Sequence, residues 1–224
     1  MEIAAIMKAR TLAFIDLDEL NKGGKIRFSE IVQPLVKQFD FQSFPTNVED
    51  FDLEDKGVTF SSGRSGDIVI DTLQIYSGAI YVESLSSTKD SQKALLEILE
   101  WGTANLGLTY YEGMIRRWAY ISDILFYTNF PILKQMSVPL SRLADSTSEI
   151  MDGLWGGLKY QPLSFNIGHD PTSRKHGIAG FSIQHRVNSQ VGENKYFSEA
   201  PIPTDLHIKL LQEFERDVLE GGSR

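Results

Sequence analysis

Along this chain, the spacing of apolar residues switches in an ordered way between the two-residue period of a β-strand and the 3.6-residue period of an α-helix. The alternating stretches of the first half are residues 10–17, 57–62, 67–76 and 79–84. Glycine-containing segments separate the last three stretches, and such segments are typical of tight turns between antiparallel strands. We therefore expect an antiparallel sheet that amphipathic helices cover.

Two segments of the first half have helical spacing. The first begins at Ser29, which is a residue type that caps helix N-termini, although Pro34 favours a later start. The second begins at Asp90 or Ser91 and ends near Gly107, because glycine readily adopts the left-handed conformation that often ends a helix. Each helix has one apolar face with which to cover the sheet.

The second half repeats this order of elements. We expect a long strand over residues 114–128, a helix that Asn129 and Pro131 open, and two strands over 160–167 and 177–187. The helix after Pro131 should carry four apolar residues on one face: Ile132, Met136, Leu140 and Leu143. A final helix begins at Thr204, and Leu206, Leu210, Phe214 and Val218 should line one face of it, with Leu211 beside them.

Short sequence similarities between the halves suggest an internal duplication of a β-α-β-β-(β)-α unit. Residues 32–37 resemble 137–142, and residues 94–100 resemble 209–215. Short helices rich in Leu and Glu match one another easily, so chance similarity stays an alternative. The predicted class is α+β, with an antiparallel sheet covered by helices on one face.

The domain organisation follows from the absence of a linker sequence. No Gly/Ser-rich or Pro-rich segment separates the halves, which would span residues 8–107 and 113–220. We therefore predict a single compact body over residues 1–224, within which the two half-sheets join edge to edge.

The charge balance and the residues that are missing limit the classes of function. The 22 basic and 30 acidic residues give a formal charge of −8, which argues against nucleic acid as the main partner. No apolar run approaches the ~20 residues of a membrane-spanning helix, and the N-terminus lacks the pattern of a signal peptide. The chain has no cysteine, which excludes disulfides and thiolate metal sites. We expect a cytoplasmic protein without a membrane partner.

Asp16 and Asp18 are the first candidate catalytic residues. They stand at i and i+2 at the end of an apolar strand, so both carboxylates point to one side, which suits a divalent cation such as Mg²⁺. The stretch 13–20 resembles the first strand of haloacid-dehalogenase-type phosphatases and the acidic strand of diguanylate cyclases and lesion-bypass polymerases. This resemblance implies Mg²⁺-dependent phosphoryl or nucleotidyl transfer with Asp16 and Asp18 as metal ligands.

The resemblance covers only those eight residues. The chain lacks the Thr or Val that the phosphatases place shortly after their second Asp, and the Gly-Gly-acid-acid-Phe turn of the cyclases. The alternative interpretation is that Asp18 and Asn21 begin the turn after a buried strand by bonding their own backbone.

A histidine-containing loop is the second candidate for chemistry. His169 and His176, with Asp170 between them, could hold a transition metal or supply a general base. Their spacing matches no closed zinc pattern, and the residues between them have ordinary turn composition. We therefore predict no metal or cofactor.

Basic and aromatic residues supply candidate ligand-binding groups. Arg116, Arg117, Trp118 and Tyr120 open the predicted long strand, and Arg64 lies in a Ser/Gly-rich segment. Such residues could grip a phosphate or carboxylate and stack against a base. The alternative is a half-buried strand whose arginine stems lie along apolar surface.

Two further features are candidates for binding a partner. The acidic stretch 49–55 holds Phe51 and Asp52, which pair an aromatic anchor with charge for a basic partner, although such a stretch is usually a solvated loop. Trp155 stands among glycines that cannot bury it locally, so it either packs against a distant segment or serves a binding surface.

No convergent catalytic set emerges from these candidates, so we predict a non-enzymatic interaction or adaptor module. Its expected partner is a protein or a second copy of the chain. One alternative is a domain that binds an anionic metabolite or nucleotide, and another is the Mg²⁺-dependent enzyme. The layout also loosely resembles the doubled ferredoxin-like folds of RNA-binding CRISPR-associated proteins, an interpretation that the acidic balance argues against.

Overall fold

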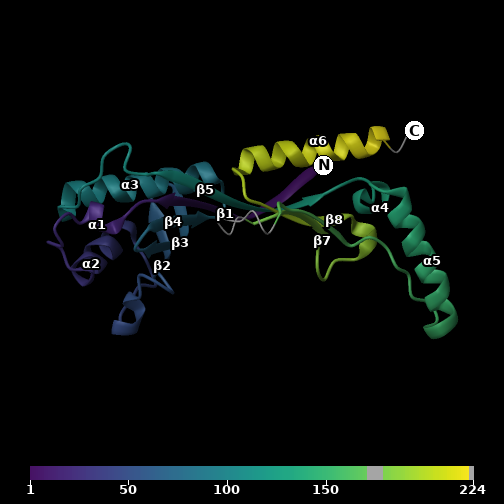
Figure 1. Cartoon of the computed structure of the whole chain (residues 1–224), viewed down its shortest axis with the longest axis horizontal. Helices are drawn as coiled ribbons and strands as arrows, with labels where there is room; N and C mark the ends of the chain where they lie inside the picture. The colour runs from purple at the N-terminus through teal and green to yellow at the C-terminus, as the bar shows by residue number, and fades with distance from the viewer. Residues whose placement is uncertain (171–178, 222–224) are drawn as a thin grey trace. The chain divides into compact units, whose positions relative to one another are not determined.

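A computed structural model describes residues 1–170 and 179–221 (Figure 1). The chain forms an eight-stranded antiparallel sheet with helices, in the strand order β2-β3-β4-β1-β5-β8-β7-β6. The predicted α+β class is therefore confirmed. The strands are β1 (Glu2–Phe14), β2 (Val58–Ser65), β3 (Ile68–Tyr76), β4 (Ala79–Ser84), β5 (Arg117–Tyr127), β6 (Ser164–Ile167), β7 (Phe181–His185) and β8 (Lys195–Ala200). The α-helices are α1 (Leu17–Leu20), α2 (Phe28–Phe39), α3 (Thr88–Leu106), α4 (Ile132–Gln135), α5 (Val138–Trp155) and α6 (Thr204–Gly221), and the short 3-10 helices are η1 (Val48–Phe51) and η3 (Val191–Glu193).

The chain divides into two compact units, each with its own apolar core. The N-terminal unit comprises Lys8–Ser122 and Ile202–Thr204, and the C-terminal unit comprises Met1–Met7, Asp123–Pro201 and Asp205–Arg224. The first four strands follow the order β2-β3-β4-β1, and the last four follow the corresponding order β6-β7-β8-β5. Internal duplication and a single body stay predictions.

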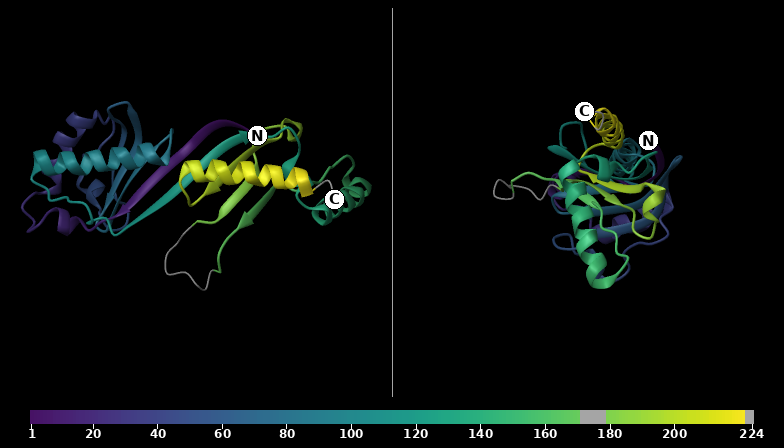
Figure 2. Two further views of the ribbon diagram at one scale, coloured as in Figure 1. Left: turned by 90° about the horizontal axis from the view of Figure 1, so that it is seen from above. Right: turned by 90° about the vertical axis from the view of Figure 1, so that its right-hand side faces the viewer.

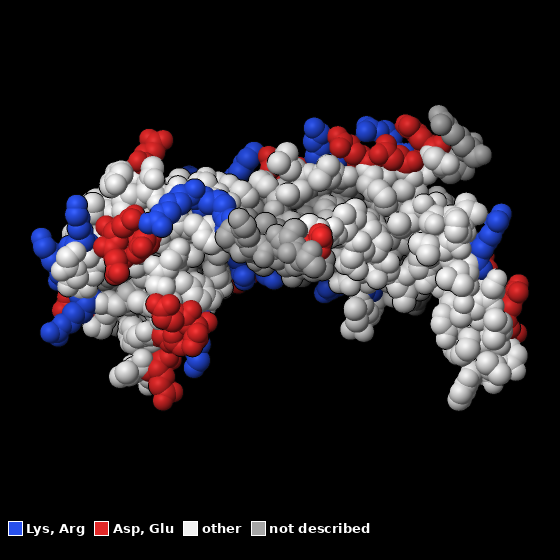
Figure 3. Space-filling model, in the orientation of Figure 1, with Lys and Arg blue, Asp and Glu red and all other residues white. Residues whose placement is uncertain are grey.

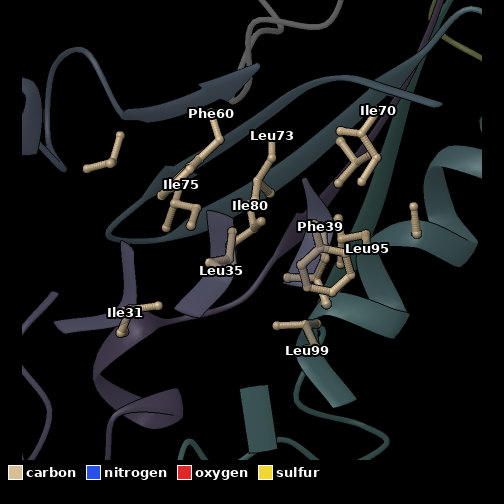
Figure 4. Close-up of a cluster of buried hydrophobic side chains, with 14 of the residues drawn as sticks. Ile31, Leu35, Phe39, Phe60, Ile70, Leu73, Ile75, Ile80, Leu95 and Leu99 are labelled. Carbon is tan, nitrogen blue, oxygen red and sulfur yellow. The ribbon is translucent and has the colours of Figure 1, made fainter. Parts of the chain in front are cut away.

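In the N-terminal unit, helices cover the face of the sheet to which the apolar residues point. On β2 and β3 the buried residues alternate with more exposed ones, so each strand presents one apolar face. Helices α2 and α3 bury their own apolar faces against the same cluster of side chains. Figure 4 labels ten of them: Ile31, Leu35, Phe39, Phe60, Ile70, Leu73, Ile75, Ile80, Leu95 and Leu99.

The ends of α3 follow known capping rules. Ser87 caps α3, since its side chain accepts a hydrogen bond from the backbone N–H of Asp90, and Gly107 ends the helix with a φ of 73°. The predicted end at Gly107 is confirmed, and the true start lies slightly earlier than predicted.

Helix α2 begins at Phe28 although Pro34 lies inside it, so the expected delay of its start is wrong. The buried apolar face of α2 outweighs the backbone hydrogen bond that Pro34 cannot donate.

In the C-terminal unit, α6 lies on one face of the strands (Figure 2). Of the residues predicted to line its apolar face, Leu206 and Leu210 are 50% and 45% exposed. The residues one position along, His207 and Leu211, are 0% and 1% exposed. Strand β8 meets this inward face: Ser198 is fully buried, and its Oγ lies 2.8 Å from His207 Nε2, which gives that ring nitrogen a partner in the core.

The chain forms two helices where the sequence predicts one helix after Pro131. Helix α4 buries Ile132 and Leu133, and α5 then starts at a new N-cap, where the Ser137 side chain accepts a hydrogen bond from the Leu140 N–H. A single apolar face from Ile132 to Leu143 therefore does not form, because the backbone changes direction between the two helices. Within the described residues, no helix is long and apolar enough to span a bilayer.

Candidate functional site

Helix α5 presents the candidate site. All 18 of its residues, every one within the described part of the chain, are exposed or half-buried. Pro139 in its first turn suits the N-terminus of a helix, and Gly156, with a φ of 70°, ends it. A helix this long normally gains most of its stability by packing an apolar face, so the accessibility of α5 is unusual.

An apolar stripe runs the length of α5. Its large residues are Leu140, Leu143, Ile150 and Leu154, which are 45%, 64%, 64% and 68% exposed. With Thr147 between them, they recur at alternating spacings of three and four residues, which is the heptad pattern of helices that pair along a seam. We call these five residues the α5 stripe.

The residues beside the α5 stripe carry no charge. Ala144, Ser146, Met151 and Gly153 flank it at the positions that in coiled coils select a partner by charge. The charged residues of α5 lie on its opposite side and are Arg142, Asp145, Glu149 and Asp152. The space-filling view shows a mostly uncharged surface over this helix (Figure 3).

The segment that follows α5 runs back along the helix on the side of Ser148 and Asp152, away from the α5 stripe. The Gly157 N–H donates to Asp152 Oδ1 at 2.7 Å, and the Tyr160 N–H donates to Ser148 Oγ at 2.7 Å. These bonds hold the segment close to the helix. Its apolar residues are also exposed, and Trp155, at the end of the helix, is 77% exposed, so this predicted partner-binding residue lies at the surface.

Asp16 organises a turn. It is the N-cap of α1, where its carboxylate accepts a hydrogen bond from the Asp18 N–H at 2.9 Å. The Arg116 guanidinium lies 2.6 Å from Glu19 Oε1 and 3.9 Å from Asp16 Oδ2. The side chain of Asp18 is exposed. The structure thus brings Arg116 to Asp16, two predicted site residues from different candidate sites.

Metal binding at these residues stays a prediction. In residues 1–170 and 179–221, no three potential metal-ligating side chains gather into one group. His169 is exposed in the segment after β6, and His176 lies outside the described residues. Neither candidate set therefore acquires a third ligand in the part of the chain that is described.

The other predicted ligand-binding residues each make separate local contacts. The Arg117 guanidinium stacks over the ring of Phe14 at 4.1 Å, and Trp118 is half-buried against the N-terminal core. Tyr120 is also half-buried, and burial raises the pKa of its phenol. Arg64 is exposed and lines a surface hollow of about 250 Å³ that also includes two carboxylates, Asp40 and Asp71. Those carboxylates would oppose an anionic ligand in this hollow.

In the acidic stretch 49–55, Asp50 and Asp52 hold the loop together. The Asp50 carboxylate accepts hydrogen bonds from the N–H groups of Asn47 and Thr46, and these bonds lower its pKa. The Asp52 carboxylate accepts from the N–H groups of Asp55 and Glu54, and its pKa is lowered for the same reason. Phe51 is half-buried, and its ring packs edge-on against Phe28, with 6.1 Å between ring centroids.

Comparison with protein-family models and with curated protein sequences found no match to this chain. The geometry of the chain is therefore the basis for inferring its function. The α5 stripe is the strongest feature of that geometry; it is not among the predicted sites, although its heptad spacing can be read directly from residues 140–154.

Proposed function

We propose that this protein is a non-enzymatic interaction module that associates with a second copy of itself through the α5 stripe. The observation that carries this proposal is the exposure of four large apolar side chains at heptad spacing on one helix. The predicted cytoplasmic location belongs to the same proposal, since the chain has no cysteine.

The physical basis is the cost of leaving this surface in water. Burying a Leu or Ile side chain completely is worth about 1.5–3 kcal/mol. A contiguous apolar surface rimmed by polar groups is typical of interaction sites on proteins. Pairing two α5 helices would remove such side chains from water in both copies at once, while the polar sides of the helices stay solvated.

A second copy is the occupant that the chemistry favours. An apolar stripe is complementary to itself, and a twofold interface uses the same surface patch on both subunits. The flanking positions are uncharged, so no like-charge repulsion opposes self-pairing and no charge pattern selects a different partner. The charged residues on the far side of α5 would keep the paired helices soluble.

The test is the molar mass in solution, measured by size-exclusion chromatography with light scattering over a concentration series. We expect wild-type protein to form a dimer, and the Leu143→Gln/Ile150→Gln variant to have a dissociation constant at least about 100-fold higher, since four apolar side chains per dimer are lost. The matched control is Asp145→Gln/Glu149→Gln on the opposite side of the helix, which should dimerise like wild type.

Two results would count against this proposal. Wild-type protein that is strictly monomeric at every concentration would remove self-association altogether. A dimer that both variants weaken equally, or that neither weakens, would place the interface away from the α5 stripe. Gln forms helices well, and the substituted positions are exposed, so unfolding is not expected to confuse the comparison.

A further inference from the structure

The core of the N-terminal unit contains a cavity of about 170 Å³. Residues of α1, α2, α3 and the adjoining ends of β3 and β4 form its walls. Five of the lining side chains are labelled in Figure 4, and each is at most 8% exposed: Ile31, Leu35, Ile75, Ile80 and Leu99. The cavity is thus enclosed mainly by buried aliphatic groups.

A cavity of this size and lining is suited to an apolar occupant. Protein interiors are close-packed, and voids larger than a water molecule are few. A buried water needs two to four polar partners, whereas an aliphatic cavity of about 150 Å³ in another protein stays dry and binds benzene. The volume here therefore matches the body of a molecule with one ring or a short alkyl chain.

One side of the cavity is charged and open to solvent. Asp18 is an exposed residue among those that line the cavity, so the cavity reaches the surface at this residue. The neighbouring Arg116 pairs with Asp16 and Glu19, and among the described residues the Asp18 carboxylate has no hydrogen-bond donor or ion-pair partner. No Lys or Arg is among the described residues that line the cavity.

We propose that this cavity binds a small apolar amine, with its ring or alkyl body among the aliphatic side chains and its ammonium group beside Asp18. An anion would have to approach the Asp18 carboxylate with no Lys or Arg among the described lining residues to offset the repulsion. A neutral molecule of the same shape would gain the apolar contacts only. The site lies within the N-terminal unit and is separate from self-association through α5.

Three probes that share one ring test this assignment: benzylamine, benzyl alcohol and benzoate. Binding to the full chain is measured by methyl NMR titration, in which saturable shifts and ring-to-methyl NOEs should appear at Ile31, Ile80 and Leu99. We expect benzylamine to bind most tightly, benzyl alcohol more weakly, and benzoate not at all. The variant Asp18→Asn should weaken benzylamine about two- to five-fold, as for an exposed ion pair, and leave benzyl alcohol unchanged.

A cavity-filling variant, Leu35→Phe, should abolish binding of both benzylamine and benzyl alcohol. The Asp18→Asn variant alters only an exposed side chain, so the test survives if Leu35→Phe folds poorly. The Leu143→Gln/Ile150→Gln variant should bind all probes like wild type. The proposal is overturned if no probe produces saturable shifts at these methyl groups, if benzoate binds as tightly as benzylamine, or if Asp18→Asn leaves the preference for the amine intact.

Discussion

Leu143 and Ile150 lie one heptad apart on α5, and each exposes 64% of its surface. Leu211 on α6, in the same unit, is 1% exposed. The two helices therefore have opposite relationships to the core of the C-terminal unit, although both carry an apolar stripe in their sequences.

This difference predicts unequal costs for the same substitution. Leu211→Ala should lower the free energy of unfolding by about 2–5 kcal/mol, because it leaves a cavity in the core. Leu143→Ala should change it by about 0.5 kcal/mol or less, because that side chain is already in water. Urea unfolding at a concentration where the protein is monomeric measures both. Equal losses would mean that α5 packs as tightly as α6.

Gly63 is expected to tolerate no side chain. A Cβ placed there would lie 2.4 Å from the ring of Phe41 and 2.9 Å from the carbonyl oxygen of Phe39, which is backbone and cannot move aside easily. We expect Gly63→Ala to cost about 1–3 kcal/mol of stability through overpacking. Gly78→Ala is the matched control, since a Cβ there meets no atom within 4 Å. The thermal midpoints of both variants report the difference, and equal midpoints would refute it.

Ser198 should stabilise the C-terminal unit through two hydrogen bonds of its buried side chain. Its hydroxyl donates to the Ser182 carbonyl oxygen at 2.7 Å and lies 2.8 Å from His207 Nε2. Ser198→Ala removes one partner of that carbonyl and one of the buried imidazole, so we expect a loss of about 1–3 kcal/mol. Ser164→Ala, on an exposed position of β6, should be nearly neutral. Urea midpoints that shift equally for both variants would contradict this account.

The loop around residues 46–56 should loosen at low pH. Because hydrogen bonds hold the pKa of Asp50 and Asp52 below the ordinary aspartate value of 3.8, their contribution to stability is fully present above that value and is lost as the pH falls through the lowered pKa. The amide proton of Asn47, observed by NMR, should change shift and exchange faster over that acidic range. In Asp50→Asn the titration of this amide should disappear. If the pH dependence of the Asn47 amide is unchanged in Asp50→Asn, a group other than Asp50 causes it.

Hydrophobic periodicity was sufficient to predict the class of fold and most of the elements. Strands β2, β3 and β4 begin within one residue of the predicted starts, because an amphipathic strand next to a glycine turn leaves few alternatives. Strand β8 was not predicted. Its inward face is Tyr196, Ser198 and Ala200, and the serine in the middle breaks the apolar alternation.

The predicted sites show a different limit. The carboxylates of Asp16, Asp50 and Asp52 have sequence contexts that suggest metal or partner binding, yet in the structure each accepts hydrogen bonds from nearby backbone N–H groups. Local sequence does not distinguish these uses, because a carboxylate is a ligand, a cap or a solvated charge according to what surrounds it.

By itself, the sequence determined the antiparallel sheet, the helices that cover it, and the heptad spacing of α5, because these follow from the period at which apolar side chains recur. Only the tertiary structure decided which apolar surfaces are covered. The core of the C-terminal unit is filled by α6 with His207 turned inward, while the α5 stripe stays in water. The cavity beside Asp18 has the same origin, since an unfilled volume depends on how several elements meet and not on the sequence of any one of them.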